Sequence, residues 1–327
     1  MRPGRSGRGG NGCETYFKYM ETAMKQDDEA EQVLRPLVFG EVLYDSFPDG
    51  SVVLGGAPFN VAWHLQGFGL SPLFISRVGD DELGERILAA MTEWGMDTRG
   101  VQRDASHPTG RVVVSINNNE PSFEIVPEQA YDFIAGDALQ ALLRQERYGL
   151  VYHGSLIARH PPARAALDMV REAGLPLFVD VNLRDPWWRR EWLDDALRRS
   201  NWAKLNEHEL QMLSPREAAD DIKAQAEELR RACDLEWLVV TRGGEGALVL
   251  ADDEVVETTP GRVEGLVDTV GAGDAFSSVT ILGLLRGWPL PALVQRAVDF
   301  AAAVCRMRGA TGRDRDLYEH YLRKWTE

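Results

Sequence analysis

The stretch DTVGAGDAFSS, from Asp268 to Ser278, has the residue types of a loop that handles a transferring anion. Gly271 and Gly273 leave the backbone N–H groups bare, and the apolar run that follows predicts a buried helix beginning near Gly271. The first N–H groups of a helix lack partners within it, and its amino end carries roughly +0.5 of an elementary charge. The loop has no lysine, so it is not the usual P-loop. It suits the negative charge that develops during phosphoryl transfer.

Asp274 is the second chemical feature of this loop, because it lies in the first turn of the predicted helix, beside the anion site. A carboxylate repels a resting phosphate, but it can take a proton from an attacking hydroxyl. The alternative is that Asp274 only complements the positive end of the helix dipole. The buried character of the helix favours the catalytic interpretation.

Several polar residues follow other predicted strands, at the edge where open parallel sheets bind their ligands. Loops are polar in general, so the shared position of these residues is what indicates a site. They are Asp45, Asp180, Asn182, Arg184, Asn206 and Thr241.

The segment GGAPFNVAWHLQGFG opens a helix with two glycines, Gly55 and Gly56. The bare backbone there lets a small polar molecule approach closely. Asn60 projects from the first turn and can both donate and accept hydrogen bonds. A turn followed by a capped helix is the alternative interpretation.

The stretch LNEHEL has the spacing of a capping box, with Asn206 at the helix start and Glu209 three residues later. Simple capping is one interpretation, and a carboxylate that holds water around a magnesium ion is the other. Thr241 at a strand end is placed to contact a phosphate. A hairpin turn explains the glycines that follow it equally well.

The elements that position these residues alternate from Leu34 onward. Longer periodic stretches such as DELGERILAAMTEWG and AADDIKAQAEELRRAC predict helices. Apolar runs of strand length occur in PLVFGEVLYD, SPLFISRVGD, GLVYHGS, PLFVDVN, WAKLN and WLVVTRGG. Buried strands that alternate with helices predict an α/β fold with a mostly parallel central sheet covered on both faces.

One region breaks this alternation. Thr109 to Val126 has two β-rich arms around NNNEP and no helix between them, which predicts an antiparallel hairpin that stands off the main sheet as a lid. Phe47 to Gly56 adds edge strands, so we expect the lid segments at about 47–54 and 98–127. We expect one core domain over residues 33–325, preceded by a disordered, Gly- and Arg-rich leader over residues 1–32. The exposed edge of the lid predicts a homodimer.

The composition excludes several classes of partner. A formal net charge of −15 argues against nucleic acid, which requires a basic face. No apolar run reaches the roughly 18 residues that a membrane-spanning helix needs. The three cysteines are far apart and have no CxxC spacing, so they indicate neither a disulfide framework nor a zinc site. They favour a reducing, cytoplasmic compartment.

Taken in order along the chain, the motifs GGAxxN, DxNxR, NxxE, TxGxxG and GAGD resemble those of the ribokinase-like, or PfkB, carbohydrate kinases. The resemblance covers roughly Leu34 to Leu322. It implies a three-layer α/β/α sandwich with a small β lid over the sugar, in agreement with the pattern of elements. It also implies an enzyme that binds a small sugar and ATP and uses Mg²⁺ and K⁺.

The resemblance assigns roles on the acceptor side of the site. It makes Asp274 the catalytic base, with Gly271, Ala272 and Gly273 as the anion hole. Family positions that bind the sugar correspond to Asp45, Gly55, Gly56, Asn60 and Arg184.

It also assigns roles on the nucleotide side. Glu209 organises magnesium indirectly, and the positions that bind ATP correspond to Asn206, Glu209, Thr241, Gly243, Gly246, Gly271 and Gly273. Asp268 and the Val270 carbonyl fit a monovalent cation site, which the segment Arg306 to Gly312 closes.

Within the family, GEVLYDSFPDG and GGAPFNVA look most like fructokinases, so the expected acceptor is the terminal hydroxyl of D-fructose. The 2-keto-3-deoxygluconate kinases are the second candidate subfamily, because they share the DxNxR motif. In such an enzyme Arg184 would bind either a substrate carboxylate or an ATP phosphate. A ribokinase-type sugar kinase is a further alternative, and a sugar-phosphate kinase would draw on Arg111, Arg159 and Arg184. A non-catalytic sugar or nucleotide sensor belongs to another class, which fold alone does not exclude.

Overall fold

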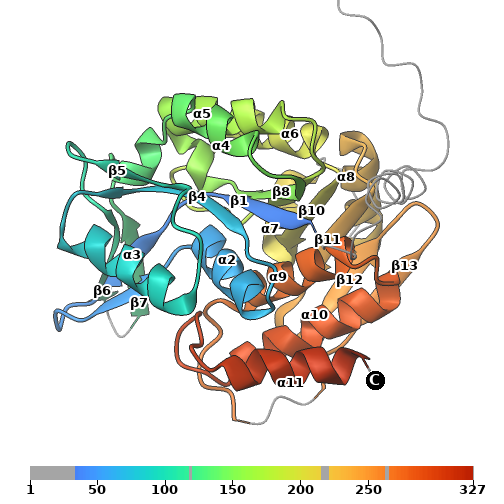
Figure 1. Ribbon diagram of the computed structural model, residues 1–327. Helices are drawn as coiled ribbons and strands as arrows, with labels where there is room; N and C mark the ends of the chain where they lie inside the picture. The colour runs from blue at the N-terminus through green and yellow to red at the C-terminus, as the bar shows by residue number, and fades with distance from the viewer. Residues whose placement is uncertain (1–33, 118–119, 215–220, 262–264, 327) are drawn as a thin grey trace, which may run out of the picture. The chain divides into compact units, whose positions relative to one another are not determined.

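Apolar strands build a nine-stranded sheet in the computed structural model, which describes residues 34–326 except 118–119, 215–220 and 262–264 (Figure 1). The leader expected over residues 1–32 lies outside the described residues. In spatial order the strands are β13 (Val255–Thr258), β12 (Ala247–Leu250), β11 (Trp237–Thr241), β10 (Trp202–Asn206), β9 (Leu177–Asp180), β8 (Tyr148–Gly154), β1 (Arg35–Phe39), β4 (Leu73–Gly79) and β5 (Val101–Asp104). The strands from β11 to β5 are parallel to one another, and β12 pairs antiparallel with both β11 and β13. The predicted mostly parallel sheet is confirmed.

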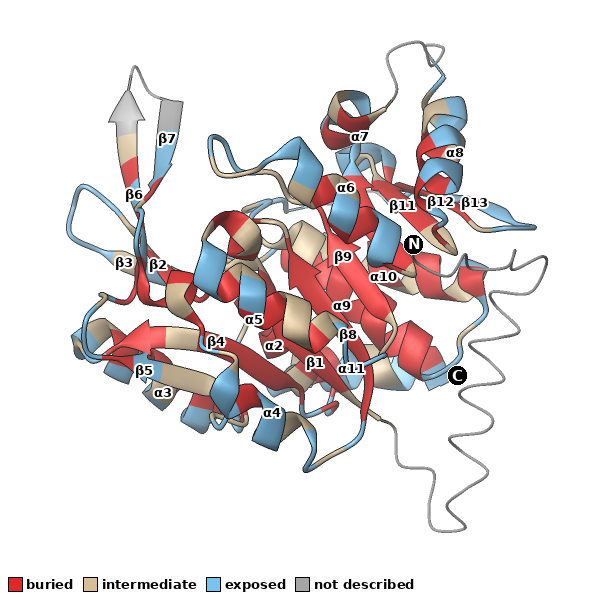
Figure 2. Ribbon diagram, turned by 90° about the horizontal axis from the view of Figure 1, so that it is seen from above, coloured by how far each residue is buried: buried red, intermediate tan, exposed pale blue. Residues whose placement is uncertain are grey.

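Helices cover both faces of this sheet, which confirms the predicted three layers (Figures 1 and 2). One face carries α2 (Ala57–Gly67), α3 (Glu82–Trp94), α9 (Ala272–Leu285), α10 (Leu290–Val304) and α11 (Arg315–Thr326). The other carries α4 (Asp137–Leu143), α5 (Pro161–Arg171), α6 (Arg190–Arg199), α7 (Glu207–Leu213) and α8 (Ile222–Cys233). Short 3₁₀ turns are η1 (Ala130–Phe133), η2 (Leu156–Arg159) and η3 (Gly243–Glu245). In the described part of the chain, no helix is long and apolar enough to cross a membrane.

A second, four-stranded sheet has the order β3 (Val52–Gly55), β2 (Leu43–Ser46), β6 (Gly110–Asn117), β7 (Glu120–Ile125). The β6–β7 pair is antiparallel, as the sequence predicts, whereas β2 and β6 are parallel.

Register determines which side chains of this sheet face the main domain. Asp45 is paired with Val53 and Val112, and Val114 with Phe123, so these side chains share one face. Deeper on that face, Leu43, Val112 and Ile125 pack on Leu156. Phe123, on the same face, is 59% exposed.

Two predictions about these segments are wrong in part. The stretch PLVFGEVLYD is two strands in different sheets, because the chain turns between them where Gly40 packs against Pro58; a Cβ at Gly40 would lie 2.2 Å from Pro58 Cγ. The lid does not begin at residue 98, because Val101–Asp104 pairs in parallel with β4 at the edge of the large sheet. That short polar strand has little apolar pattern from which its pairing could be read.

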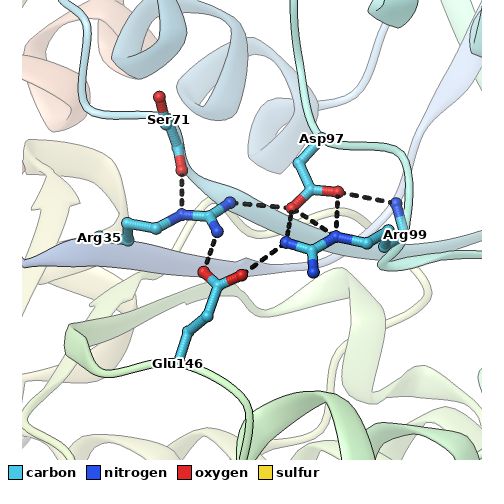
Figure 3. A network of polar contacts seen from close by, with 5 residues as sticks. All are labelled: Arg35, Ser71, Asp97, Arg99 and Glu146. Carbon is cyan, nitrogen blue, oxygen red and sulfur yellow. Dashed lines mark hydrogen bonds and ion pairs between the residues drawn. The ribbon is translucent and has the colours of Figure 1, made fainter.

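A charge-balanced network holds the amino ends of the central strands (Figure 3). Arg35, which begins β1, donates to the Ser71 carbonyl over 2.6 Å and to Asp97 over 3.0 Å, and it also pairs with Glu146. Arg99 donates to Asp97 and to Glu146, each over 2.6 Å. The network fixes three loops at the edge of the sheet opposite the carboxyl ends of the strands.

Candidate active site

The first and last motifs of the chain meet in one hydrogen bond. Asn60, in the first turn of α2, donates from Nδ2 to Oδ2 of Asp274, in the first turn of α9, over 2.8 Å. The residues are 214 positions apart, and the packing of α2 on α9 brings them together. Asn60 is buried, and its Oδ1 has no hydrogen-bond partner among the described residues. A predicted sugar-binding residue therefore touches the predicted base and has an acceptor atom still unpaired.

Gly271 begins helix α9 in a conformation that side chains rarely adopt. It is the N-cap residue, with φ of 80° and ψ of −3°. A Cβ on Gly271 would lie 2.4 Å from the Cβ of Ala310, so glycine is required at this position. The helix is buried from Ala275 to Leu285, which confirms the predicted buried helix (Figure 2). Its positive end lies beside Asp274, and the Ala272 N–H donates to the Thr269 carbonyl over 3.3 Å.

The carboxyl group of Asp274 has the acidity expected of a base near neutral pH. Burial raises its pKa to about 6, because the charged form loses solvation. The hydrogen bond from Asn60 and the charges of Lys204 and Arg184 lower the pKa, and the charge of Asp180 raises it. The group is therefore mostly ionised at pH 7 and still basic enough to accept a hydroxyl proton.

We expect kcat/KM for the sugar to decrease at acid pH with an apparent pKa near 6. Protonated Asp274 cannot accept a proton, so activity is present above this pKa and is lost as the pH falls through it. Initial rates between about pH 5 and pH 8, at constant ionic strength and saturating MgATP, measure this decrease, which is the acid limb of the pH profile. A flat profile across this range would contradict the assignment.

The lid and the α2 glycines form the neighbouring part of the site. The Asp45 carboxylate of β2 lies alongside Gly55, where a Cβ would be 3.5 Å from Asp45 Oδ2. Gly56 has φ of 108°, and a Cβ there would lie 2.7 Å from the carbonyl oxygen of Glu41. A side chain is therefore excluded at Gly56, whereas at Gly55 a Cβ would make only ordinary contact with Asp45.

Arg184 is an exposed cation whose charge reaches this group of acids. It lowers the pKa values of Glu41, Asp45 and Asp274, although burial is the larger influence on each and raises them. The charge of Arg184 thus acts on the predicted base and on the predicted sugar-binding residue Asp45.

Glu41 is a buried acid that our sequence interpretation missed. It lies two residues after the end of β1, is 4% exposed, and its Oε2 has no hydrogen-bond partner among the described residues. Burial raises its pKa to about 7, while the charges of Arg184 and Arg159 lower it. The available signal was an acid immediately after the apolar run PLVFG, at the carboxyl end of a central strand.

Arg159 and Arg111 do not add free positive charge to the site. Arg159 is buried and donates to both carboxylate oxygens of Asp132, over 2.7 and 2.6 Å, and to the Val126 carbonyl over 2.9 Å. Arg111 lies on the lid face opposite Asp45, and its guanidinium donates to Ser46 over 3.3 Å. Of Arg111, Arg159 and Arg184, only Arg184 is therefore left to bind the phosphate group of a sugar phosphate.

On the nucleotide side, the predicted capping box is present. Asn206 Oδ1 accepts from the Glu209 N–H over 2.9 Å, and Glu209 Oε2 accepts from the Asn206 N–H over 2.8 Å. The second Glu209 oxygen accepts from the Leu183 N–H over 2.7 Å, which ties the DxNxR loop to α7. Glu209 therefore shapes the loop that carries Arg184, and its indirect role toward magnesium stays a prediction.

The TxGxxG segment lies next to this box. Thr241 is paired with Asn206 across β10 and β11, so both lie at the carboxyl edge of the sheet. Gly243 has open space where a Cβ would be, whereas a Cβ on Gly246 would lie 1.8 Å from the Thr258 carbonyl oxygen. The close approach of β13 is thus sufficient to require glycine at position 246. The predicted contact between Gly246 and the nucleotide stays a prediction.

Asp268 links two segments of the predicted cation loop, whose binding of a cation stays a prediction. Asp268 accepts from the Val270 N–H over 3.0 Å and from the Gly309 N–H over 3.3 Å, so the 306–312 segment folds onto it. No cluster of three or more His, Cys, Asp or Glu side chains suited to a metal occurs in the described ranges.

Lys204 is a second residue that our sequence interpretation missed. It lies in the middle of β10, its side chain is 7% exposed, and Nζ is 2.8 Å from Asp180 Oδ1. A Cβ on Gly273 would lie 3.4 Å from this Nζ, so the ammonium group is next to the anion-hole loop. A lone lysine within the apolar strand WAKLN was the signal.

A hollow of about 570 Å³ lies elsewhere, between the ends of β4 and β5 and helix α5. It is lined in part by Arg77, Asp104, His107 and Phe133 and contains none of the predicted site residues. Arg77 is already paired with Asp104 over 2.9 Å and donates to the Phe133 carbonyl over 2.7 Å. We assign it no part in the chemistry.

Comparison with known proteins identifies the family and agrees with the fold. The chain matches the model described as pfkB family carbohydrate kinase over residues 35–315. The fructokinase of Klebsiella pneumoniae is 31% identical over 290 residues, 81% of this chain and 89% of that protein. A fructokinase of Xylella fastidiosa with bound ATP superposes with a TM-score of 0.77 at 22% identity, over 90% of this chain and 99% of that one. A double mutant of the Vibrio cholerae O395 fructokinase, with fructose, ADP and potassium bound, superposes with a TM-score of 0.73 at 24% identity, over 89% and 99%.

Proposed function

Because this chain belongs to the pfkB family of carbohydrate kinases and is therefore an ATP-dependent sugar kinase, we propose that its acceptor is D-fructose, which it converts to fructose 6-phosphate. The observation that carries the proposal is the 2.8 Å contact between Asn60 and Asp274, which joins the sugar-side motif to the base. The similarity to fructokinases at about 30% identity supports fructose over other sugars.

In this proposal, each residue acts at a stated atom. Asp274 takes the proton from the terminal hydroxyl as that oxygen forms its bond to the γ-phosphorus, and ADP leaves with the electrons of the broken P–O bond. Asn60 and Asp45 hold sugar hydroxyls, and the N–H groups of residues 271–273 stabilise the charge on the transferring group. Magnesium, organised by Asn206 and Glu209, would neutralise charge on the ATP phosphates when bound.

The charges around the acceptor favour a neutral sugar. Glu41, Asp45 and Asp274 are acids on this side of the site, and Arg159 is occupied by Asp132. Arg184 is the specific feature that supports the second candidate, a 2-keto-3-deoxygluconate kinase, because it is exposed and could pair with a carboxylate.

A coupled ADP assay tests the proposal with fructose, ribose, 2-keto-3-deoxygluconate, adenosine and fructose 6-phosphate as acceptors. We expect the highest kcat/KM with fructose. Highest activity with the acidic sugar would favour the second candidate, and ADP release without dependence on any acceptor would contradict both.

Two accessory features belong to the proposal. We propose that potassium binds at Asp268 and the Val270 carbonyl, a hypothesis supported by the potassium in the related Vibrio structure; rates unchanged when sodium or choline replaces potassium would remove it. We also propose a homodimer through the lid, where Val53 and Phe123 expose apolar side chains on one face. A monomeric mass by light scattering would contradict the dimer.

A further inference from the structure

The ammonium group of Lys204 is buried next to the predicted anion-hole loop, Gly271–Gly273. Its neighbours in β10, Ala203 and Leu205, are fully buried, and its own side chain is almost entirely enclosed. Burial of an ammonium group is unfavourable unless the charge is compensated. Its nearest charged partner, Asp180, lies 2.8 Å away, and the acids Glu209 and Asp274 also raise the pKa of Lys204 against the lowering effect of burial. Lys204 therefore keeps its charge within a group of three acids.

Asp180 fixes the ammonium group in this position. Its Oδ1 accepts from Lys204, and its Oδ2 accepts from the Tyr152 hydroxyl over 3.1 Å and from Ser277 Oγ over 2.8 Å. Tyr152 belongs to β8 and Ser277 to α9, three residues after Asp274. One carboxylate thus connects three neighbouring strands to the helix that carries the base.

We propose that Lys204 supplies, from the adjacent strand β10, the positive charge that the loop Gly271–Asp274 itself lacks, and that Asp180 is the positioning residue that holds it there. The proposal rests on the kinase function above. The Nζ group lies 3.4 Å from the point where a Gly273 Cβ would be. Its positive charge therefore adds to that of the loop N–H groups and stabilises the negative charge on the transferring phosphoryl group. A lysine absent from the loop in sequence is thus present beside it in space.

Lys204 and Asp180 also influence the pKa of the proposed base, Asp274. Four charged residues influence or face Asp274: Asp180 and Glu41 are negative, and Lys204 and Arg184 are positive. Removing the charge of Lys204 should move the acid limb of the kcat/KM profile to higher pH, because the carboxylate loses a favourable neighbour. Removing the charge of Asp180 should move it to lower pH. A residue needed only for folding would not produce opposite shifts.

The experiment compares Lys204→Met, Asp180→Asn and the double variant Lys204→Met/Asp180→Asn with the unmodified chain. For Lys204→Met we expect kcat to decrease by roughly tenfold to a hundredfold with little change in KM for fructose, because the lost charge acts mainly on the transition state. The acid limb should rise in Lys204→Met and fall in Asp180→Asn. Lys223→Met, at an exposed site on α8, is the matched control and should behave like the unmodified chain.

The double variant keeps the test decisive if Lys204→Met does not fold, because it leaves no buried charge without a partner. It should fold, retain the kcat loss, and show an acid limb close to that of the unmodified chain. Normal kcat in a folded Lys204→Met or double variant, or limbs that shift in the same direction in both single variants, would overturn the proposal. Failure of the kinase function itself is distinguishable, since the unmodified chain would then produce no sugar-dependent ADP.

Discussion

Asp274→Asn should lower kcat by at least about a hundredfold, because an amide cannot take the proton of the acceptor hydroxyl. The substitution preserves shape, and its side-chain oxygen can still accept the hydrogen bond that Asn60 gives to Asp274. We therefore expect an unchanged fold by circular dichroism and unchanged fructose binding by calorimetry, with the loss confined to turnover in the coupled ADP assay.

Asp253→Asn is the matched control for this variant. Asp253 is an exposed acid in the loop between β12 and β13, so the same change of charge there should leave turnover unaffected. Near-normal kcat in Asp274→Asn would show that Asp274 is not the base and would return it to the simpler role of complementing the helix dipole.

Gly271→Ala should cause the second large effect, a decrease in kcat/KM of about a hundredfold. The added Cβ would lie 2.4 Å from Cβ and 2.7 Å from Cα of Ala310, and the residue has φ of 80°. Relief of this contact requires the backbone at the start of α9 to move, and misplacement of catalytic groups by about 1 Å can cost a hundredfold in rate. The same strain should reduce the free energy of unfolding by about 1–3 kcal/mol.

Gly273→Ala is the matched comparison, two residues further along the same loop. Its Cβ would meet only Lys204 Nζ, at an ordinary van der Waals distance of 3.4 Å, and the backbone there needs no left-handed conformation. We expect at least about a tenfold smaller loss of kcat/KM than for Gly271→Ala, measured side by side with stability from urea unfolding. Equal losses in the two variants would contradict the role given to Ala310.

Features that depend on local pattern could be predicted from the sequence. The capping box of Asn206 and Glu209 follows from a spacing of three residues, and the buried helix after Gly271 follows from an unbroken apolar run. The alternation of strands and helices was likewise sufficient for the parallel sheet. In each case the physical cause lies within a short window of the chain.

Features that depend on distant contacts could not be read in the same way. The turn that separates β1 from β2 depends on contact between Gly40 and Pro58, and the pairing of Arg159 with Asp132 depends on how η1 meets η2. Lys204 appeared as one charge in an apolar strand, and nothing in its neighbours indicates Asp180 or Gly273 as partners. The family resemblance supplied the roles of Asp45 and Arg184, which their positions after predicted strands alone did not.

The contact between Asn60 and Asp274 also has a consequence for synthesis on the ribosome. Asp45, Gly55, Gly56 and Asn60 belong to the first 60 positions of the chain, whereas the proposed base Asp274 is translated 214 residues after Asn60. Because chains grow from the amino end, every incomplete product that stops before α9 lacks the base, the anion hole and the Ser277 contact to Asp180. Under the proposed mechanism, such truncated chains retain sugar-side residues and do not transfer a phosphoryl group.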